Sequence, residues 1–75
     1  MKNNIKPKHS RAISQLKYTK GENTLTIQYL NGGRYIYAGV TPFVWSLVKG
    51  YGKDNGYGKA VNQIVKPNHN FIKVG

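Results

Sequence analysis

Few side chains in this sequence of 75 residues could do acid–base, nucleophilic or metal chemistry. The chain has no cysteine, and its only side-chain carboxylates and imidazoles are Glu22, Asp54, His9 and His69. A serine–histidine–acid triad or a carboxylate pair would need these scattered groups held rigidly together. The two histidines and Asp54 also lack the spacing of a metal site. We therefore expect a protein that is not an enzyme and that holds neither a metal nor another cofactor.

Positive charge is the strongest chemical signal in the sequence. Twelve lysine and arginine side chains face two acids, which gives a formal net charge of +10. An anionic polymer relieves the self-repulsion of such a chain and releases counterions when it binds. Six of the basic residues lie in residues 1–20 and five in 49–75, whereas 21–48 contain only Arg34. The charge therefore favours nucleic acid as the partner, although a basic surface with no such role remains an alternative.

Basic and aromatic side chains supply the candidate nucleic-acid contacts. Aromatic rings can stack on the bases of a single strand. The stacking candidates are Tyr51 and Tyr57 in a basic glycine-rich segment, and Trp45 on a helix too short to bury every side. A Tyr-x-Tyr at Tyr35 and Tyr37 could be a second platform, but so small a core needs aromatic bulk, which favours a core role. The candidate phosphate contacts are Lys6, Lys8, Arg11, Lys49, Lys53, Lys59 and Lys66.

Alternating polarity predicts three antiparallel strands that would position these groups. Residues 10–18 are strand-like, and residues 23–30 alternate apolar and polar side chains with period two. The Asn-Gly-Gly sequence at 31–33 is typical of a hairpin turn, so residues 34–38 should form the return strand. Arg34 should reach solvent beside Ile36, on the face away from the two tyrosines.

After these strands the pattern predicts two short helices. Thr41 suits the N-cap of a helix over 42–49, and glycine-rich residues 50–58 predict a mobile loop. A second helix fits residues 57–66, and the tail over 68–75 could add a short edge strand. We expect an α+β fold: a three-stranded antiparallel meander followed by two short helices packed on one face.

Length and composition indicate one domain over residues 10–75, preceded by a flexible basic arm over 1–9. The lack of cysteine favours the cytoplasm. No segment approaches the roughly 18 apolar residues that span a bilayer, so we expect no membrane association. The predicted core consists of Leu25, Ile27, Tyr29, Tyr35, Tyr37, Val40, Val44, Leu47, Val48, Val61 and Val65.

From Ser10 to about Val65 the sequence resembles the KTSC domain, found at the C-terminus of some lysyl-tRNA synthetases and as stand-alone bacterial or phage proteins. The aromatic strand, Asn-Gly turn and Tyr-x-Tyr motif of that family are matched by Leu25, Ile27, Tyr29, Asn31, Gly32, Tyr35 and Tyr37. Its two helix starts are matched by Gly39, Val40, Thr41 and Pro42, and by Gly58, Val61, Asn62 and Val65. The resemblance implies the family's fold and, through the synthetase association, RNA binding.

One part of the family pattern is missing from this chain. Family members usually carry Ser-x-Gly at the start of the last helix, where this sequence has Gly56-Tyr57-Gly58. Any role of that serine therefore does not carry over.

Two functions remain open at this point. The first is a small nucleic-acid-binding module for RNA or single strands, in which lysines and arginines contact phosphates and exposed aromatics contact bases. The alternative is a protein-interaction module that docks on an acidic surface of a larger host protein or enzyme, through apolar residues of the first helix. An open strand edge could also pair two copies into a homodimer.

Overall fold

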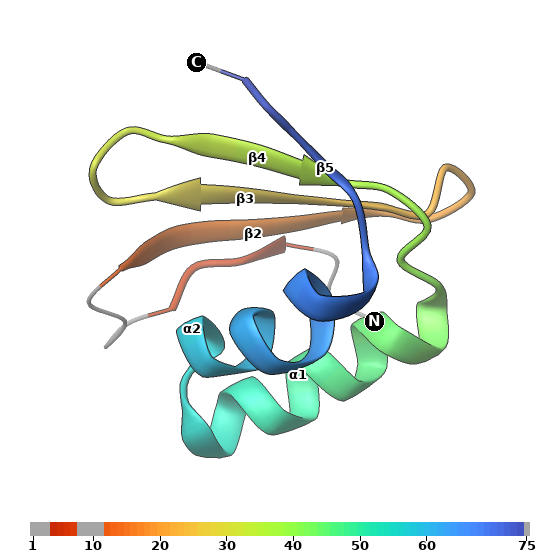
Figure 1. Ribbon diagram of the computed structural model, residues 1–75. Helices are drawn as coiled ribbons and strands as arrows, with labels where there is room; N and C mark the ends of the chain where they lie inside the picture. Colours follow the sequence, from red (N-terminus) through yellow and green to blue (C-terminus); the bar gives the residue numbers. More distant parts are fainter. Residues whose placement is uncertain (1–3, 8–11, 75) are drawn as a thin grey trace.

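The computed structural model describes residues 4–7 and 12–74. The chain forms an antiparallel sheet and a helical layer, so the predicted α+β class is confirmed (Figure 1). The helical layer comprises α1 (Pro42–Asn55), α2 (Tyr57–Ala60), the π-helical turn η1 (Val61–Val65) and the 3-10 turn η2 (Lys66–Asn68). The strands are β1 (Asn4–Ile5), β2 (Ile13–Thr19), β3 (Thr24–Tyr29), β4 (Arg34–Tyr37) and β5 (Phe71–Lys73).

The sheet has five strands in the order β1-β2-β3-β4-β5, and each neighbouring pair is antiparallel. The predicted meander forms its middle, and the tail adds the expected edge strand as β5. The strand β1 is an addition, because Asn4 pairs with Lys17 and Ile5 with Leu16. The prediction of a free arm is therefore wrong at these two residues, since Ile5 also packs against the core. Residues 1–3, 8 and 9 of that arm lie outside the described residues.

A bulge in β2 explains why simple alternation describes this strand poorly. Ile13 and Leu16 have opposite parity, yet both are buried. The register between β2 and β3 shifts between Ile13 and Gln15, so the two side chains reach the same face. At the same end of β3, directly after Tyr29, the hairpin turn forms as expected, with Gly32 at a φ of 97°.

Helix α1 is longer than the sequence predicts. Thr41 caps it as expected, because its Oγ1 accepts a hydrogen bond from the backbone N–H of Val44 at 3.2 Å. The helix does not end at Gly50 but runs to Asn55, where Gly56 takes a φ of 97°. The predicted loop over 50–58 is therefore wrong. Its glycines are tolerated in the helix because tertiary packing outweighs their low helix propensity.

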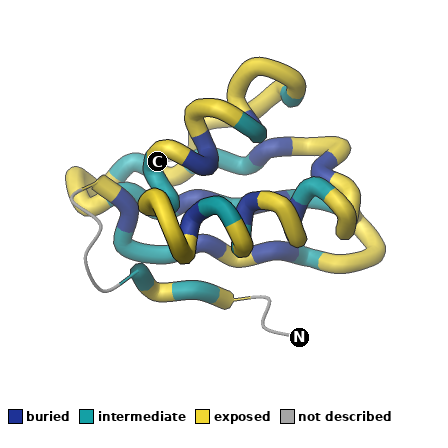
Figure 2. Tube along the Cα trace, turned by 90° about the horizontal axis from the view of Figure 1, so that it is seen from below, coloured by how far each residue is buried: buried dark blue, intermediate teal, exposed yellow. Residues whose placement is uncertain are grey.

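One core fills the space between the helices and one face of the sheet, whereas none of the helices formed by residues 4–7 and 12–74 covers the opposite face (Figure 1). Buried positions recur along both layers (Figure 2). Of the predicted core residues, those that the structure buries are Leu25, Ile27, Tyr37, Val40, Val48, Val61 and Val65. Tyr29, Tyr35 and Val44 pack partly buried against this core.

Leu47 was predicted to lie in the core and does not, because 45% of it is exposed on α1. A helix that packs against a sheet on one side buries one stripe of its surface. In α1 that stripe contains Trp45, Val48 and Gly52. None of the helices in the described part of the chain is long and apolar enough to cross a membrane.

Candidate functional site

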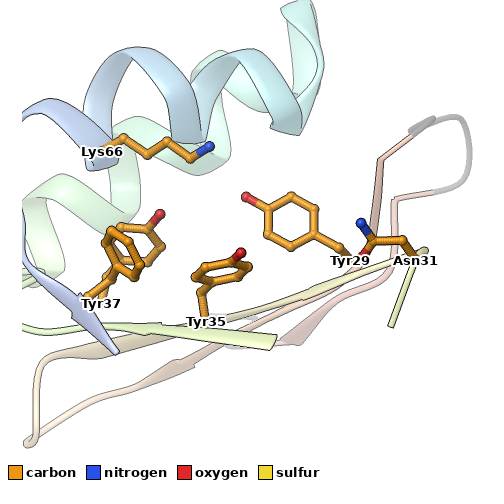
Figure 3. Close-up of a pocket in the computed structure, with 6 residues that line it drawn as sticks. Tyr29, Asn31, Tyr35, Tyr37 and Lys66 are labelled. Atoms are coloured by element: carbon orange, nitrogen blue, oxygen red, sulfur yellow. The ribbon is translucent and has the colours of Figure 1, made fainter. Parts of the chain in front are cut away.

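A cavity of about 380 Å³ opens between the sheet and the last helical turns. We call it the tyrosine pocket; it is lined by Tyr29, Asn31, Tyr35, Tyr37, Lys66 and Phe71. Figure 3 shows the three tyrosine rings rising from the sheet and Lys66 extending over them from the helical side. The pocket therefore joins side chains from β3, the β3–β4 turn, β4, η2 and β5.

Strand register explains why three tyrosines meet on the helical side of the sheet. Tyr37 pairs with Leu25 and Tyr35 with Ile27, and directly paired residues share a face. Leu25 and Ile27 are fully buried under the helices, so both tyrosines point the same way. Tyr29 follows on that face at the period-two spacing of β3. The helices cover Tyr37 and leave the other two tyrosines half-buried, which opens the pocket toward Tyr29.

Ring contacts hold the walls of the tyrosine pocket in place. The rings of Tyr29 and Tyr35 meet edge to face, with centroids 5.4 Å apart and an interplanar angle of 89°. Phe71 packs against both Tyr35 and Tyr37, at 5.3 Å and 5.5 Å. Such contacts stabilise aromatic clusters beyond simple burial. The hydroxyl groups are consequently carried on rings with fixed positions.

The polar groups of the pocket suit an anion. Within the described part of the chain, no residue hydrogen-bonds the side-chain hydroxyls of Tyr29, Tyr35 and Tyr37 or the ammonium of Lys66. Burial raises the pKa of Tyr29 and Tyr37 above 10, and the neighbouring tyrosines raise it further. Both phenols are therefore protonated at neutral pH and can donate hydrogen bonds.

Positive charge lies at the tyrosine pocket, and no acidic side chain is in its lining. Lys66 is part of its lining, and neither Glu22 nor Asp54 is. The Nζ atom of Lys73 lies 6.0 Å from the centroid of Tyr35, close enough to add a second cation to the rim. An ammonium and several neutral donors around one cavity can bind a phosphate or another oxyanion.

Of the predicted phosphate contacts that the structure describes, only Lys66 lines the pocket. Lys6, Lys53 and Lys59 are exposed elsewhere on the surface. Lys49 lies with its Nζ 5.6 Å from the ring centroid of Trp45. Lys8 and Arg11 lie outside the described residues. The structure therefore assigns one of these lysines to a defined cavity and leaves the others as predictions.

The prediction that Trp45 stacks on bases is wrong. Trp45 is fully buried and stacks on Tyr18, with ring centroids 5.3 Å apart and an interplanar angle of 12°. A helix against a sheet places its bulkiest ring inside, and in α1 the neighbouring ring of Phe43 is the exposed one, at 72%.

The stacking candidates Tyr51 and Tyr57 are half-buried in the helical layer. The hydroxyl of Tyr51 donates to Oε1 of Gln63 at 2.8 Å, and the ring of Tyr57 lies over Gly52. Both rings link α1 to the helical turns that follow, which limits the ring surface left for a base.

Phe71 and Asn31 belong to the site but were not among the predicted site residues. Phe71 is 54% exposed at the pocket. The apolar tail after Pro67 was the available signal for Phe71, whereas Asn31 was recognised only as a turn residue. The Oδ1 of Asn31 accepts a hydrogen bond from Gly33 N–H at 3.0 Å, which leaves its amide NH₂ as a donor at the pocket.

A second hollow lies on the open face of the sheet. It has a volume of about 400 Å³ and is lined by Gln15, Lys17, Thr26, Gln28, Arg34 and Ile36. Arg34 is exposed beside Ile36, as predicted, and its Nε donates to Oε1 of Gln28 at 2.9 Å. This hollow has no aromatic ring. Among the described residues, no group of three or more metal-binding side chains is close enough to hold a metal ion.

In comparisons with known proteins, residues 9–52 match the family model of the KTSC domain. The fold is also similar to the crystal structure of a KTSC domain protein from Yersinia pestis. The two share 23% sequence identity at a TM-score of 0.76, over 92% of this chain and 93% of that one. No curated protein matches this chain. The Tyr-x-Tyr motif, which lines the pocket with Tyr35 and Tyr37, lies inside the matched segment.

Proposed function

We propose that this chain, which belongs to the KTSC domain family, is a non-catalytic binding module for RNA or single-stranded nucleic acid. The tyrosine pocket holds a phosphate group of the bound strand. One observation carries the proposal: three phenol hydroxyls and the ammonium of Lys66 face a single cavity and have no hydrogen-bond partner among the described residues. None of the three hydroxyls is cut off from solvent, and Lys66 is exposed, so a bound phosphate would replace water at donors that already face one cavity.

Charge and aromatic exposure support the same proposal. A net charge of +10 attracts a phosphate backbone and makes the affinity depend on salt. Phe71 is 54% exposed beside the pocket and offers a ring face to the base next to the bound phosphate, the role first assigned to Trp45. The lack of cysteine fits a reducing compartment, so we place this function in the cytoplasm.

Fluorescence anisotropy with a labelled single-stranded RNA tests the proposal. The wild-type chain should bind at low salt, and log K should fall with log salt by roughly 0.7 per phosphate contact. Lys66→Gln should weaken binding about 10-fold, since it removes a charge-assisted hydrogen bond. Lys17→Gln is the matched control, because Lys17 is exposed on the opposite face of the sheet. Equal losses for the two variants, or no binding by the wild type, would contradict the proposal.

An acidic protein partner is the second candidate, and helix α1 provides the observation that favours it. Phe43 and Leu47 are 72% and 45% exposed and lie one turn apart on this helix. Lys49 and Lys53 follow on the same helix and would complement acidic side chains. The positive charge of the chain opposes a homodimer and favours an acidic partner.

Capture from nuclease-treated lysate distinguishes this second candidate from nucleic-acid binding. If α1 is the contact surface, capture of a protein persists after nuclease treatment and is lost in a Phe43→Ser, Leu47→Ser variant. A Lys59→Glu, Lys66→Glu variant should then capture nearly as much protein as the wild type. The reverse pattern would favour the nucleic-acid proposal.

A further inference from the structure

We infer that the tyrosine pocket recognises the phosphomonoester at the end of a nucleic-acid strand in preference to a phosphodiester within it. The inference rests on the proposed function, because it specifies which phosphate of the strand the pocket holds. Three features of the pocket carry it: the number of its donors, its charge and its shape.

The number of donors matches a phosphate at the end of a strand. Tyr29, Tyr35 and Tyr37 each contribute one O–H donor, and the ammonium of Lys66 contributes three N–H donors. A phosphomonoester presents three terminal oxygens, whereas a phosphodiester presents two and links its other two to sugars. A diester would therefore engage fewer of these donors, and each charge-assisted hydrogen bond that it does not make lowers its affinity relative to the monoester.

The charge of the pocket points in the same direction. A phosphomonoester carries about −1.5 to −2 at neutral pH, and a diester carries a single negative charge. Lys66 lines the pocket and Lys73 lies over the ring of Tyr35, so two cations face the same region. The protonated phenols of Tyr29 and Tyr37 add donors without adding negative charge. A more highly charged phosphate consequently gains more from this site.

The shape of the pocket favours a phosphate that has a single substituent. Phe71 packs against the rings of Tyr35 and Tyr37 and forms one wall of the cavity. Tyr37 is 1% exposed, so this end is deep, whereas Tyr29 is half-buried at the other end. To reach the end of the cavity near Tyr37, a terminal phosphate brings one flanking sugar with it, whereas a phosphodiester would have to bring two. Figure 3 shows the tyrosine hydroxyls directed into this space beneath Lys66.

Isothermal titration calorimetry with three RNAs of one sequence tests the inference. The strands carry a 5′-phosphate, a 3′-phosphate or hydroxyls at both ends. We expect one phosphorylated strand to bind about 10-fold more tightly than the strand with two hydroxyl ends, as one charge-assisted contact predicts. Equal affinity for all three overturns the inference and leaves the proposed function intact. If none of the three binds, the proposed function itself fails.

Conservative variants show whether the preference arises in the tyrosine pocket. Tyr35→Phe keeps the ring but removes one donor, and it should reduce the preference for the phosphorylated strand several-fold. Tyr51→Phe is the matched control, because its hydroxyl bonds Gln63 outside the pocket. An unchanged preference in Tyr35→Phe overturns the assignment to this pocket. A nucleoside monophosphate serves as the competitor. If it competes as well as the phosphorylated strand, the pocket binds free nucleotides rather than strand ends, and the inference is overturned.

Discussion

The contact between Gly52 and Tyr57 predicts that two glycines in one helix respond oppositely to the same substitution. Gly52 is buried in α1, and a Cβ atom there would lie 2.9 Å from Cγ of Tyr57 and nearer still to the ring edge. Overpacking of this kind costs about 1–3 kcal/mol. Alanine regains about 1 kcal/mol through its helix propensity. Because the overlap is severe, we expect Gly52→Ala to lower the free energy of unfolding by about 2 kcal/mol.

Gly50→Ala is the matched control for this prediction. Gly50 lies in the same helix, and a Cβ atom at this position would meet nothing within 4 Å. The substitution should raise the free energy of unfolding by up to about 1 kcal/mol. In a Tyr57→Ala background the ring is absent, so Gly52→Ala should no longer destabilise the protein. This double-mutant cycle isolates the contact between the two positions.

Denaturant unfolding followed by the fluorescence of Trp45 measures these changes. Trp45 is the only tryptophan and is fully buried, so its emission reports on the core. If Gly52→Ala stabilises the protein as much as Gly50→Ala does, α1 does not pack against Tyr57 as described. The same result would favour the flexible loop that the glycine content first suggested.

Two further substitutions test the core and the helix cap. Tyr18→Phe removes the 2.7 Å hydrogen bond to the carbonyl of Val40 and should cost about 1–3 kcal/mol in denaturant unfolding. Burial raises the pKa of Tyr18 above 10, so the wild type should lose stability as the pH rises beyond 10. Thermal melting from pH 8 to 11 measures this loss, and the melting temperature of Tyr18→Phe should fall less steeply with pH than that of the wild type. Thr41→Ala removes the side-chain acceptor for the Val44 N–H and should lower the unfolding free energy by about 1 kcal/mol, whereas no change would exclude that cap.

Local patterns predicted the centre of this fold well. Alternating polarity identified β3 and β4, and the Asn-Gly turn between them formed as expected. The strand β1 escaped prediction because two residues carry no periodic signal, and only pairing with β2 makes them a strand. The full length of α1 was not predicted, for a similar reason. Its glycines oppose a helix locally, and the compensating contact with Tyr57 is tertiary.

The candidate site was harder to predict than the fold. Parity placed Tyr35 and Tyr37 on one face, but it could not decide whether helices cover that face. The pocket also needs Lys66 and Phe71, which follow Tyr35 by about thirty residues and arrive through the turn into β5. The burial of Trp45 could not be predicted for the same reason. The orientation of an apolar helix on the sheet decides which of its rings is buried, and the sequence does not give that orientation.

Chemical-shift mapping by NMR tests most directly whether the tyrosine pocket is the nucleic-acid site. A short 5′- or 3′-phosphorylated RNA is added to the ¹⁵N-labelled chain at low salt. We expect the largest amide shifts to cluster at Asn31, Tyr35, Lys66 and Phe71 and to saturate together. Shifts centred instead on Lys17 and its neighbours on the open face, or no shifts at all, would contradict this expectation.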